Sequence, residues 1–269
     1  MAGYVDLGDR QRLEETPAAC VDLSADEVHL WQADLNLSEP QLKQLATTLS
    51  DDEQQRAHRF YFDRDRQSFI ASRGILRVIL GCYLGLEPNQ VRFSYGCRGK
   101  PALANCDRPP TVQFNLAHSQ GLALYAVTRD RALGVDLEHL RPLSDIEQLA
   151  KRFFTHKESQ LISSLTPEQR QEAFFKLWTC KEAYLKATGE GLAGLNQAEI
   201  SCSIENPASC LTIQGISPQP SQWSVIQFNP QPEYVAALAV EGQGWHLSYG
   251  EFDPESFIPP ASRNTSVFT

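Results

Sequence analysis

The sequence lacks the features that mark membrane, secreted and nucleic-acid-binding proteins. No apolar run approaches the roughly 20 residues that a membrane-spanning helix needs, and Met1 to Glu15 holds no apolar core of a signal peptide. Its 33 acidic residues outnumber its 24 Lys and Arg residues, and a net charge of −9 argues against general nucleic-acid binding, which needs a basic surface. We therefore expect a cytoplasmic protein that binds neither membranes nor nucleic acid.

Cysteine pairs with metal-binding or redox spacing are also missing. The seven cysteines are scattered and odd in number, and none forms a Cys-x-x-Cys pair. This usage predicts reduced thiols rather than a disulfide framework or a zinc site. The chain shows no short-period repeat and no low-complexity linker. Its 269 residues, 42% of them hydrophobic, suffice for one large domain or two small ones.

What the sequence does contain is a mixture of helical and strand periodicity. Helices are expected from Ser50, over 64–84, near 145–152 and 156–164, and from Pro167 to about Gly189. Strands are expected at about 91–95, 112–117, 122–128, 132–138, 198–204, 209–215, 222–229, 234–240 and 244–250. Runs of antiparallel strands beside helices indicate an α+β fold. Residues 1–25 are expected to be a polar extension and residues 251–269 an irregular tail.

The segment Gly134-Val135-Asp136-Leu137-Glu138 carries the first candidate site residues. Its apolar side chains alternate with Asp136 and Glu138, as in a strand. Residues two apart in a strand lie about 6.5–7 Å apart and point the same way, so these two carboxylates can flank one metal ion. The same alternation also fits a half-buried strand that simply exposes its polar residues to water.

A third carboxylate, Glu182, lies on the helix that begins at Pro167. At about 100° per residue, Glu182 falls within the arc of the apolar side chains, between Trp178 and Phe175. A carboxylate that faces the protein needs a cation or a metal as partner. The alternative is an i,i+4 ion pair with Lys186 on a solvated face. Three carboxylates from two rigid elements would suit a hard divalent cation that holds phosphate oxygens.

Basic residues that could bind phosphate occur in the first half of the chain. Arg66, Arg73 and Arg77 fall on one stripe of a helix, which is either a solvated basic face or a phosphate-binding one. The planar fork of arginine suits phosphate, so Arg73 is a candidate. Lys100 follows a turn and His118 closes a strand at a hairpin. Their pattern alone also fits an exposed lysine and a structural histidine.

These segments together resemble the signature motifs of 4′-phosphopantetheinyl transferases, and most closely those of the broad-specificity type called Sfp-type. The resemblance runs from about Asp51 to Gly191, with weaker continuity to about Tyr249. The matching stretches, in order, are Arg59-Phe60-Tyr61, Gly99-Lys100-Pro101, Phe114-Asn115-Leu116-Ala117-His118-Ser119, Gly134–Glu138, Lys151-Arg152-Phe153-Phe154 and Trp178–Lys186.

The resemblance implies a fold of two pseudo-symmetric halves, each a long helix packed on a small antiparallel sheet, with the active site between them. Residues 26–130 would form the N-terminal half, which contacts the phosphates and the adenine of coenzyme A. Residues 131–250 would form the C-terminal half, which holds the metal and catalytic motifs. Because one chain carries both halves, the resemblance also implies a monomer.

The activity that the resemblance implies is Mg²⁺-dependent transfer of the 4′-phosphopantetheine arm of coenzyme A to a serine of an acyl or peptidyl carrier protein, which releases 3′,5′-ADP. Such an enzyme is a holo-[acyl-carrier-protein] synthase. Asp136, Glu138 and Glu182 would hold Mg²⁺, and Mn²⁺ accepts the same ligands. Lys186 would stabilise phosphate charge. Glu182, directly or through a metal-bound water, would accept the serine proton.

Contacts to coenzyme A are also implied by the resemblance. Two departures from the family pattern are Glu53, where a relative can have a lysine that holds the 3′-phosphate, and Ala117, where a serine is frequent. The residues expected to contact coenzyme A are Arg56, Arg73, Lys100, Pro101, His118 and Lys186.

Two other functions stay open on the sequence. The chain could be another Mg²⁺-dependent phosphotransferase or hydrolase that uses the same carboxylates. It could also be a non-catalytic module that binds coenzyme A or a carrier protein. All three acidic positions and Lys186 are present, which argues against loss of catalysis.

Overall fold

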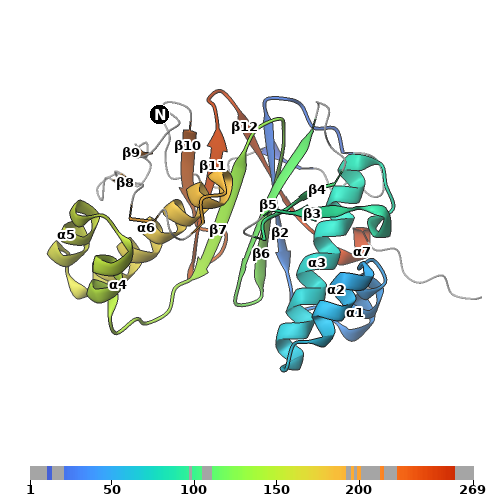
Figure 1. Ribbon diagram of the computed structural model, residues 1–269, viewed down its shortest axis with the longest axis horizontal. Coiled ribbons are helices and arrows are strands. Elements are labelled where there is room, and N and C mark those ends of the chain that lie inside the picture. The colour runs from blue at the N-terminus through green and yellow to red at the C-terminus, as the bar shows by residue number, and fades with distance from the viewer. Residues whose placement is uncertain are drawn as a thin grey trace, which may run out of the picture.

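The computed structural model describes residues 11–13, 21–96, 99–104, 111–191, 195–196, 199–200, 213–214 and 223–257. In this part of the chain two sheets pack against each other and a long helix covers the outer face of each, so the layers follow the order helix, sheet, sheet, helix (Figure 1). This confirms the predicted α+β fold. None of the described helices combines the length and the apolar character that crossing a bilayer requires.

The first sheet has five strands in the order β1-β12-β2-β6-β5. Neighbours β2, β6 and β5 are antiparallel, whereas β12 runs parallel to both β2 and β1. The sheet therefore differs from the expected purely antiparallel one. The last described strand, β12, was assigned from sequence to the C-terminal half, and it covers the edge of β2 and pairs its backbone groups. The bounds are β1 (Gln11–Arg12), β2 (Glu27–Asp34), β5 (Val112–Ser119), β6 (Leu122–Arg129) and β12 (His246–Glu251).

The second sheet is antiparallel, with three strands in the order β10-β11-β7. These are β7 (Leu133–His139), β10 (Trp223–Phe228) and β11 (Tyr234–Glu241). Two short ladders join β3 (Phe93–Tyr95) to β4 (Pro101–Leu103) and β8 (Glu199–Ile200) to β9 (Ile213–Gln214). The strands expected at 198–204 and 209–215 lie largely outside the described residues, and β8 and β9 are their described parts.

The two long helices are α3 (Asp63–Leu84) and α6 (Pro167–Thr188), and both match their predicted ranges. The capping box of Thr166 and Gln169 starts α6, and Gly189 ends it in the left-handed region with φ of 77°. The shorter helices are α1 (Glu39–Ala46), α2 (Asp51–His58), a 3-10 turn (Pro88–Gln90), α4 (Ile146–Phe153), α5 (His156–Ser164) and α7 (Pro254–Phe257).

Six of the described elements escaped the sequence-based prediction, and two of them are β4 and the 3-10 turn. Neither β2 nor α1 was expected, β1 falls within the predicted polar extension, and α7 interrupts the predicted irregular tail. The side chains of β2 from Val28 to Ala33 are all buried, and such a continuous run lacks the alternation that marks a half-exposed strand.

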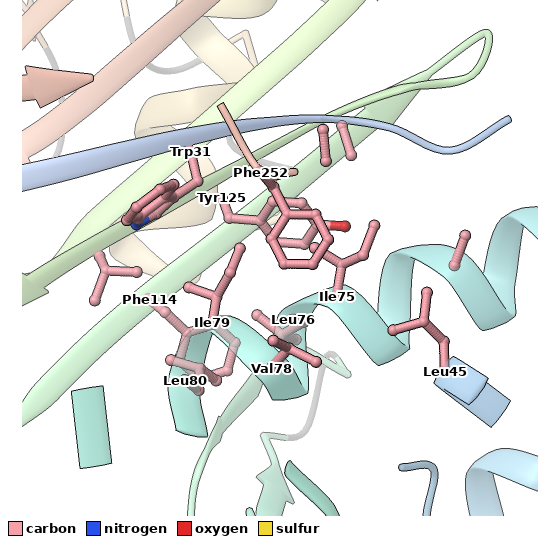
Figure 2. Packing of buried hydrophobic residues seen from close by; sticks show 14 of the residues in the cluster. Trp31, Leu45, Ile75, Leu76, Val78, Ile79, Leu80, Phe114, Tyr125 and Phe252 are labelled. Carbon is pink, nitrogen blue, oxygen red and sulfur yellow. The ribbon is translucent and has the colours of Figure 1, made fainter. Parts of the chain in front are cut away.

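Three clusters of buried side chains hold the layers together. The first joins α3 to the first sheet, where Ile75 and Ile79 meet Trp31, Phe114 and Tyr125 (Figure 2). The second joins α6 to the second sheet. The third fills the space between the two sheets and contains Leu133, Val135 and Leu137 of β7. One face of β7 therefore meets the first sheet, and its other face meets α6.

Candidate active site

The carboxylates of β7 lie on the face that α6 covers. Leu133, Val135 and Leu137 pack between the two sheets, which leaves Asp136 and Glu138 on the opposite face, as the alternation predicted. Asp136 is only 7% exposed. The alternative that Asp136 simply faces water is therefore wrong, and its charge needs a partner within the protein.

Gly134 lets α6 approach this face closely. A Cβ atom at Gly134 would lie 2.1 Å from the carbonyl oxygen of Ala183 and 2.5 Å from the amide nitrogen of Ala187. Both neighbours are backbone atoms and cannot turn away. The absence of a side chain thus sets the distance between β7 and α6, and with it the distance between Asp136 and the side chains of α6.

Lys186 of α6 reaches across to Asp136 of β7. Its Nζ lies 2.6 Å from Oδ1 of Asp136 and donates a second hydrogen bond to the carbonyl oxygen of Val135 at 3.1 Å. Among the ion pairs of the described residues, Lys186 pairs with Asp136 and not with Glu182, so the i,i+4 pair that the sequence left open is absent.

Two carboxylate oxygens beside this pair have no hydrogen-bond partner among the described residues. They are Oδ2 of Asp136 and Oε1 of Glu182, and both are buried. Burial, together with the Asp136 carboxylate, raises the pKa of Glu182 to about 7, although Lys186 acts in the opposite direction. A carboxyl group with a pKa near 7 is suited to accept and return protons at neutral pH.

Glu138 lies further toward solvent than Asp136. Its Oε2 accepts a hydrogen bond from Nη1 of Arg141 at 3.1 Å. Burial and Asp136 raise the pKa of Glu138, and Arg141 partly offsets that rise. Within the described parts of the chain, no three Asp, Glu, His or Cys side chains stand close enough together to hold a metal ion as they are. The sequence did not identify the Arg141 partner.

Side chains also form hydrogen bonds with the backbone groups on the edge of β7 that does not pair with β11. Asn115 Oδ1 of β5 accepts the amide of Val135 at 2.8 Å, and Ser119 Oγ accepts the amide of His139 at 3.2 Å. Nζ of Lys100 donates to the carbonyl oxygen of Leu133 at 3.3 Å. The role of Asn115 was missed, although a polar residue at a buried position of a strand could have signalled it.

Lys100 bridges the two halves of the site. Besides its bond to β7, its Nζ donates to the carbonyl oxygen of Lys186 in the last turn of α6, where the helix leaves carbonyl groups unpaired. Burial and the nearby Lys186 lower the pKa of Lys100 to about 8. The exposed lysine of the alternative interpretation is therefore wrong.

A cavity of about 270 Å³ opens at this point. It brings together four of the residues that the resemblance assigned to coenzyme A or to catalysis. They are Lys100, Pro101, Glu182 and Lys186, and the wall is completed by Gly99, Asn115, Leu116, Leu185, Gly189 and Gly191. Cationic groups and a proton acceptor therefore face one space, which suits a phosphate-containing ligand.

His118 lines a different hollow, next to the first. Its ring reaches solvent, yet crowding by neighbouring atoms and the charge of Lys186 lower its pKa. His118 lies two residues beyond Leu116, which lines the 270 Å³ cavity, and residues two apart on a strand share a face about 6.5–7 Å apart.

The two predicted arginines lie outside the cavity. Arg56 is exposed, with its guanidinium 5.2 Å from the centre of the Phe69 ring. Arg73 is buried, its Nε lies 3.0 Å from Oε1 of Glu53, and its Nη2 donates to the Tyr95 hydroxyl at 2.7 Å. Their contact with coenzyme A stays a prediction.

Comparison with known proteins places these features in a family. The model of the 4′-phosphopantetheinyl transferase superfamily matches residues 132–239, and that of the N-terminal region of 4′-phosphopantetheinyl transferases matches residues 31–129. The chain is 51% identical over 230 residues to the 4′-phosphopantetheinyl transferase HetI of Nostoc sp., with 86% of this chain and 94% of the relative covered.

A more distant relative agrees. The 4′-phosphopantetheinyl transferase Sfp of Bacillus subtilis is 26% identical over 160 residues, which cover 60% of this chain and 69% of the relative. A solved holo-[acyl-carrier-protein] synthase of Thermotoga maritima aligns with 42% of this chain and 63% of its own, at 20% identity and a TM-score of 0.32, too distant to inform the site. The identity and coverage of the Nostoc relative, with the two family matches, show that the chain belongs to the 4′-phosphopantetheinyl transferase superfamily.

Proposed function

We propose that Asp136, Glu138, Glu182, Lys186 and Lys100 form the centre at which this enzyme works. Membership of the superfamily makes the chain a transferase that moves phosphopantetheine from coenzyme A to a carrier protein. The observation that supports the residue assignment is the cavity in which Lys100, Lys186 and Glu182 meet beside Asp136. Oε1 of Glu182 has no hydrogen-bond partner there among the described residues.

A divalent cation fits the donor set. Mg²⁺ usually takes one or two carboxylates and completes its coordination with water and substrate phosphates. Asp136 and Glu182 each offer a buried oxygen without a partner among the described residues, and Glu138 is the third candidate once it leaves Arg141. When bound, Mg²⁺, or Mn²⁺ in its place, would neutralise charge that develops on the pyrophosphate.

The residues themselves account for the rest of the chemistry. The serine oxygen of the carrier forms a bond to the β-phosphorus of coenzyme A, and the bond from that phosphorus to the bridging oxygen breaks. The leaving group is 3′,5′-ADP, and the serine proton passes to Glu182. Lys186 and Lys100 hold the phosphate oxygens in line for this displacement.

Three aspects of the setting belong to the same proposal. The partner is an acyl or peptidyl carrier protein with a modifiable serine. The enzyme acts as a monomer, because both sheets and both long helices that frame the cavity come from one chain. It acts in the cytoplasm, in keeping with cysteines that show no disulfide spacing.

Intact mass spectrometry tests the assignment. A panel of apo acyl and peptidyl carrier proteins is incubated with the enzyme, coenzyme A and Mg²⁺, with and without EDTA. We expect a gain of about 340 Da on a carrier, lost with EDTA, as phosphoryl-transfer chemistry with an essential cation requires. Release of 3′,5′-ADP without any carrier would instead indicate a hydrolase.

Matched variants separate the site from the fold. Glu182→Gln is expected to lower the transfer rate by at least a hundredfold, since one general base contributes typically 10²–10⁴-fold. Glu172→Gln, on an exposed part of the same helix, serves as the control. Full turnover by the Glu182 variant would show that another group takes the serine proton.

A further inference from the structure

Arg141 follows β7 closely in the chain and contacts both elements that carry the candidate carboxylates. Its Nη1 lies 3.1 Å from Oε2 of Glu138, and its guanidinium carbon lies 5.5 Å from the centre of the Phe175 ring on α6. Phe175 and Glu182 are seven residues apart, so they lie on the same face of the helix. The guanidinium therefore extends from this face of α6 to the Glu138 carboxylate of β7.

The backbone on either side of Arg141 is held in place. The amide of Leu140 donates to the carbonyl oxygen of Glu233 at 2.7 Å. Pro142 follows Arg141 and restricts its backbone to extended conformations. The side chain itself is 49% exposed and has several rotatable bonds. Any change in the contact with Glu138 therefore comes from rotation of this side chain or of Glu138, and not from a shift of the main chain.

The two carboxylates of β7 each pair with a cationic side chain, but they differ in what the pairing leaves over. Asp136 uses Oδ1 for Lys186, and its buried Oδ2 has no partner among the described residues, like Oε1 of Glu182. These two side chains can accept a cation as they stand. Glu138 cannot complete the set in its present position, because no three such groups in the described ranges are close enough to share one ion. Glu138 must turn away from Arg141 first.

We propose that Arg141 is a positioning residue that competes with the divalent cation for the Glu138 carboxylate. The inference rests on the proposed function for the role of Glu138 as a cation ligand. Binding of the cation through Glu138 breaks the ion pair with Arg141, and the free energy of that pair is subtracted from the binding free energy. Arg141 thus keeps the affinity for the cation alone low, so that binding depends on the further ligands that substrate phosphates supply.

Binding of Mn²⁺ measures this competition without any transfer reaction. The dissociation constant is obtained from the electron paramagnetic resonance signal of the free ion, with the full-length protein and neither coenzyme A nor carrier present. We expect Arg141→Gln to lower this constant about fivefold, the largest effect that a partly exposed ion pair normally allows. Circular dichroism verifies that each variant is folded.

Arg152→Gln is the matched control, because it removes the same charge from another exposed arginine beside a phenylalanine ring. The guanidinium carbon of Arg152 lies 5.0 Å from the centre of the Phe153 ring, and Arg152 forms no ion pair with any residue that the structure describes. Its substitution should leave the dissociation constant of Mn²⁺ within about twofold, as for a site that does not interact with the ion.

A double variant separates competition from the simple loss of a positive charge. Glu138→Gln alone should weaken Mn²⁺ binding. In that background Arg141→Gln should change the dissociation constant by less than about twofold, because the carboxylate for which Arg141 competes is gone. A gain of equal size in both backgrounds would show a general effect of charge and would overturn the proposal.

The single variants distinguish failure of this proposal from failure of the proposed site. If Glu138→Gln weakens Mn²⁺ binding but Arg141→Gln brings no gain, the competition is refuted and Glu138 remains a cation ligand. If Glu138→Gln binds Mn²⁺ as well as the wild type does, Glu138 leaves the proposed ligand set and the competition falls with it.

Discussion

Gly134 of β7 and Ala183 of α6 are in direct backbone contact: a Cβ atom on the glycine would lie 2.1 Å from the carbonyl oxygen of the alanine. This contact decides whether Asp136, two residues along β7, can meet Lys186, one turn along α6. The glycine therefore serves the proposed active site without carrying any functional group.

Gly134→Ala should separate β7 from α6. Because the obstructing atoms are backbone, the strain is relieved only by moving the helix, and we expect a loss of about 1–3 kcal/mol in the free energy of unfolding. The transfer rate should fall further than this loss of stability explains, since small displacements of catalytic groups are costly. Urea denaturation and steady-state kinetics measure the two effects.

Gly96→Ala is the control for that experiment, because a Cβ there meets only the carbonyl oxygen of Lys100, at an ordinary 3.9 Å. Equal unfolding free energies and transfer rates for Gly134→Ala and Gly96→Ala would contradict the close approach of β7 and α6.

The sequence predicted the elements of the site better than their contacts. The alternation around Asp136 and the capping box of α6 are local patterns, so they identified a strand and a helix correctly. Partners far apart in the chain leave no such local pattern. The pairing of Lys186 with Asp136 rather than with Glu182 depends on how α6 packs on β7.

The same limit explains the missed elements and partners. The ladder of β12 with β2 pairs segments more than 200 residues apart, and no periodicity within either strand predicts this pairing. The hydrogen bond from the amide of Val135 to the side chain of Asn115 connects strands of different sheets. It depends on how the two sheets pack, which no local pattern in the sequence reveals.

Glu182 should make the enzyme less stable as the pH rises from about 4.5 to about 7. In the folded protein its pKa is raised to about 7, so the folded state holds this proton while the unfolded state has already lost it. Solvent screening of this partly exposed carboxyl group reduces the resulting loss to on the order of 2 kcal/mol, and the loss is complete above pH 7. Urea denaturation at several pH values in EDTA should show that Glu182→Gln lacks this component.

The comparison between wild type and Glu182→Gln isolates the one carboxyl group from all others that titrate. Their difference in unfolding free energy should be larger at pH 8 than at pH 5, with the variant the more stable at pH 8. A difference that does not vary with pH would mean that Glu182 is well solvated. Added Mg²⁺ should stabilise the wild type at pH 8 more than the variant.

Asp136 and Lys186 should show an energetic coupling in a double-mutant cycle. Asp136→Asn, Lys186→Met and the double variant are unfolded with urea in EDTA. We expect a coupling of about 1–2 kcal/mol, because the carboxylate is buried while the lysine is partly exposed. Lys43 and Glu39, an exposed pair with the same 2.6 Å separation, form the comparison cycle and should couple by less than about 0.5 kcal/mol. Equal coupling in the two cycles would contradict the low exposure of Asp136.

Glu53 should stabilise the fold rather than weaken the binding of phosphate. Its carboxylate is 2% exposed and pairs with Arg73 and with Arg77, whose Nε lies 2.6 Å away. Glu53→Gln would leave two buried guanidinium groups without a carboxylate, and we expect it to cost about 3–5 kcal/mol in unfolding free energy. Asp51→Asn, an exposed change on the same helix turn, should cost less than about 0.5 kcal/mol.

The KM for coenzyme A distinguishes this role of Glu53 from a direct one. If the carboxylate merely kept Arg73 away from phosphate, Glu53→Gln would release the arginine and lower the KM. We expect the KM to stay the same or to rise, because Arg73 remains bound to the Tyr95 hydroxyl and lines neither the active-site cavity nor the hollow beside His118. A lower KM with little loss of stability would return Arg73 to the set of phosphate ligands.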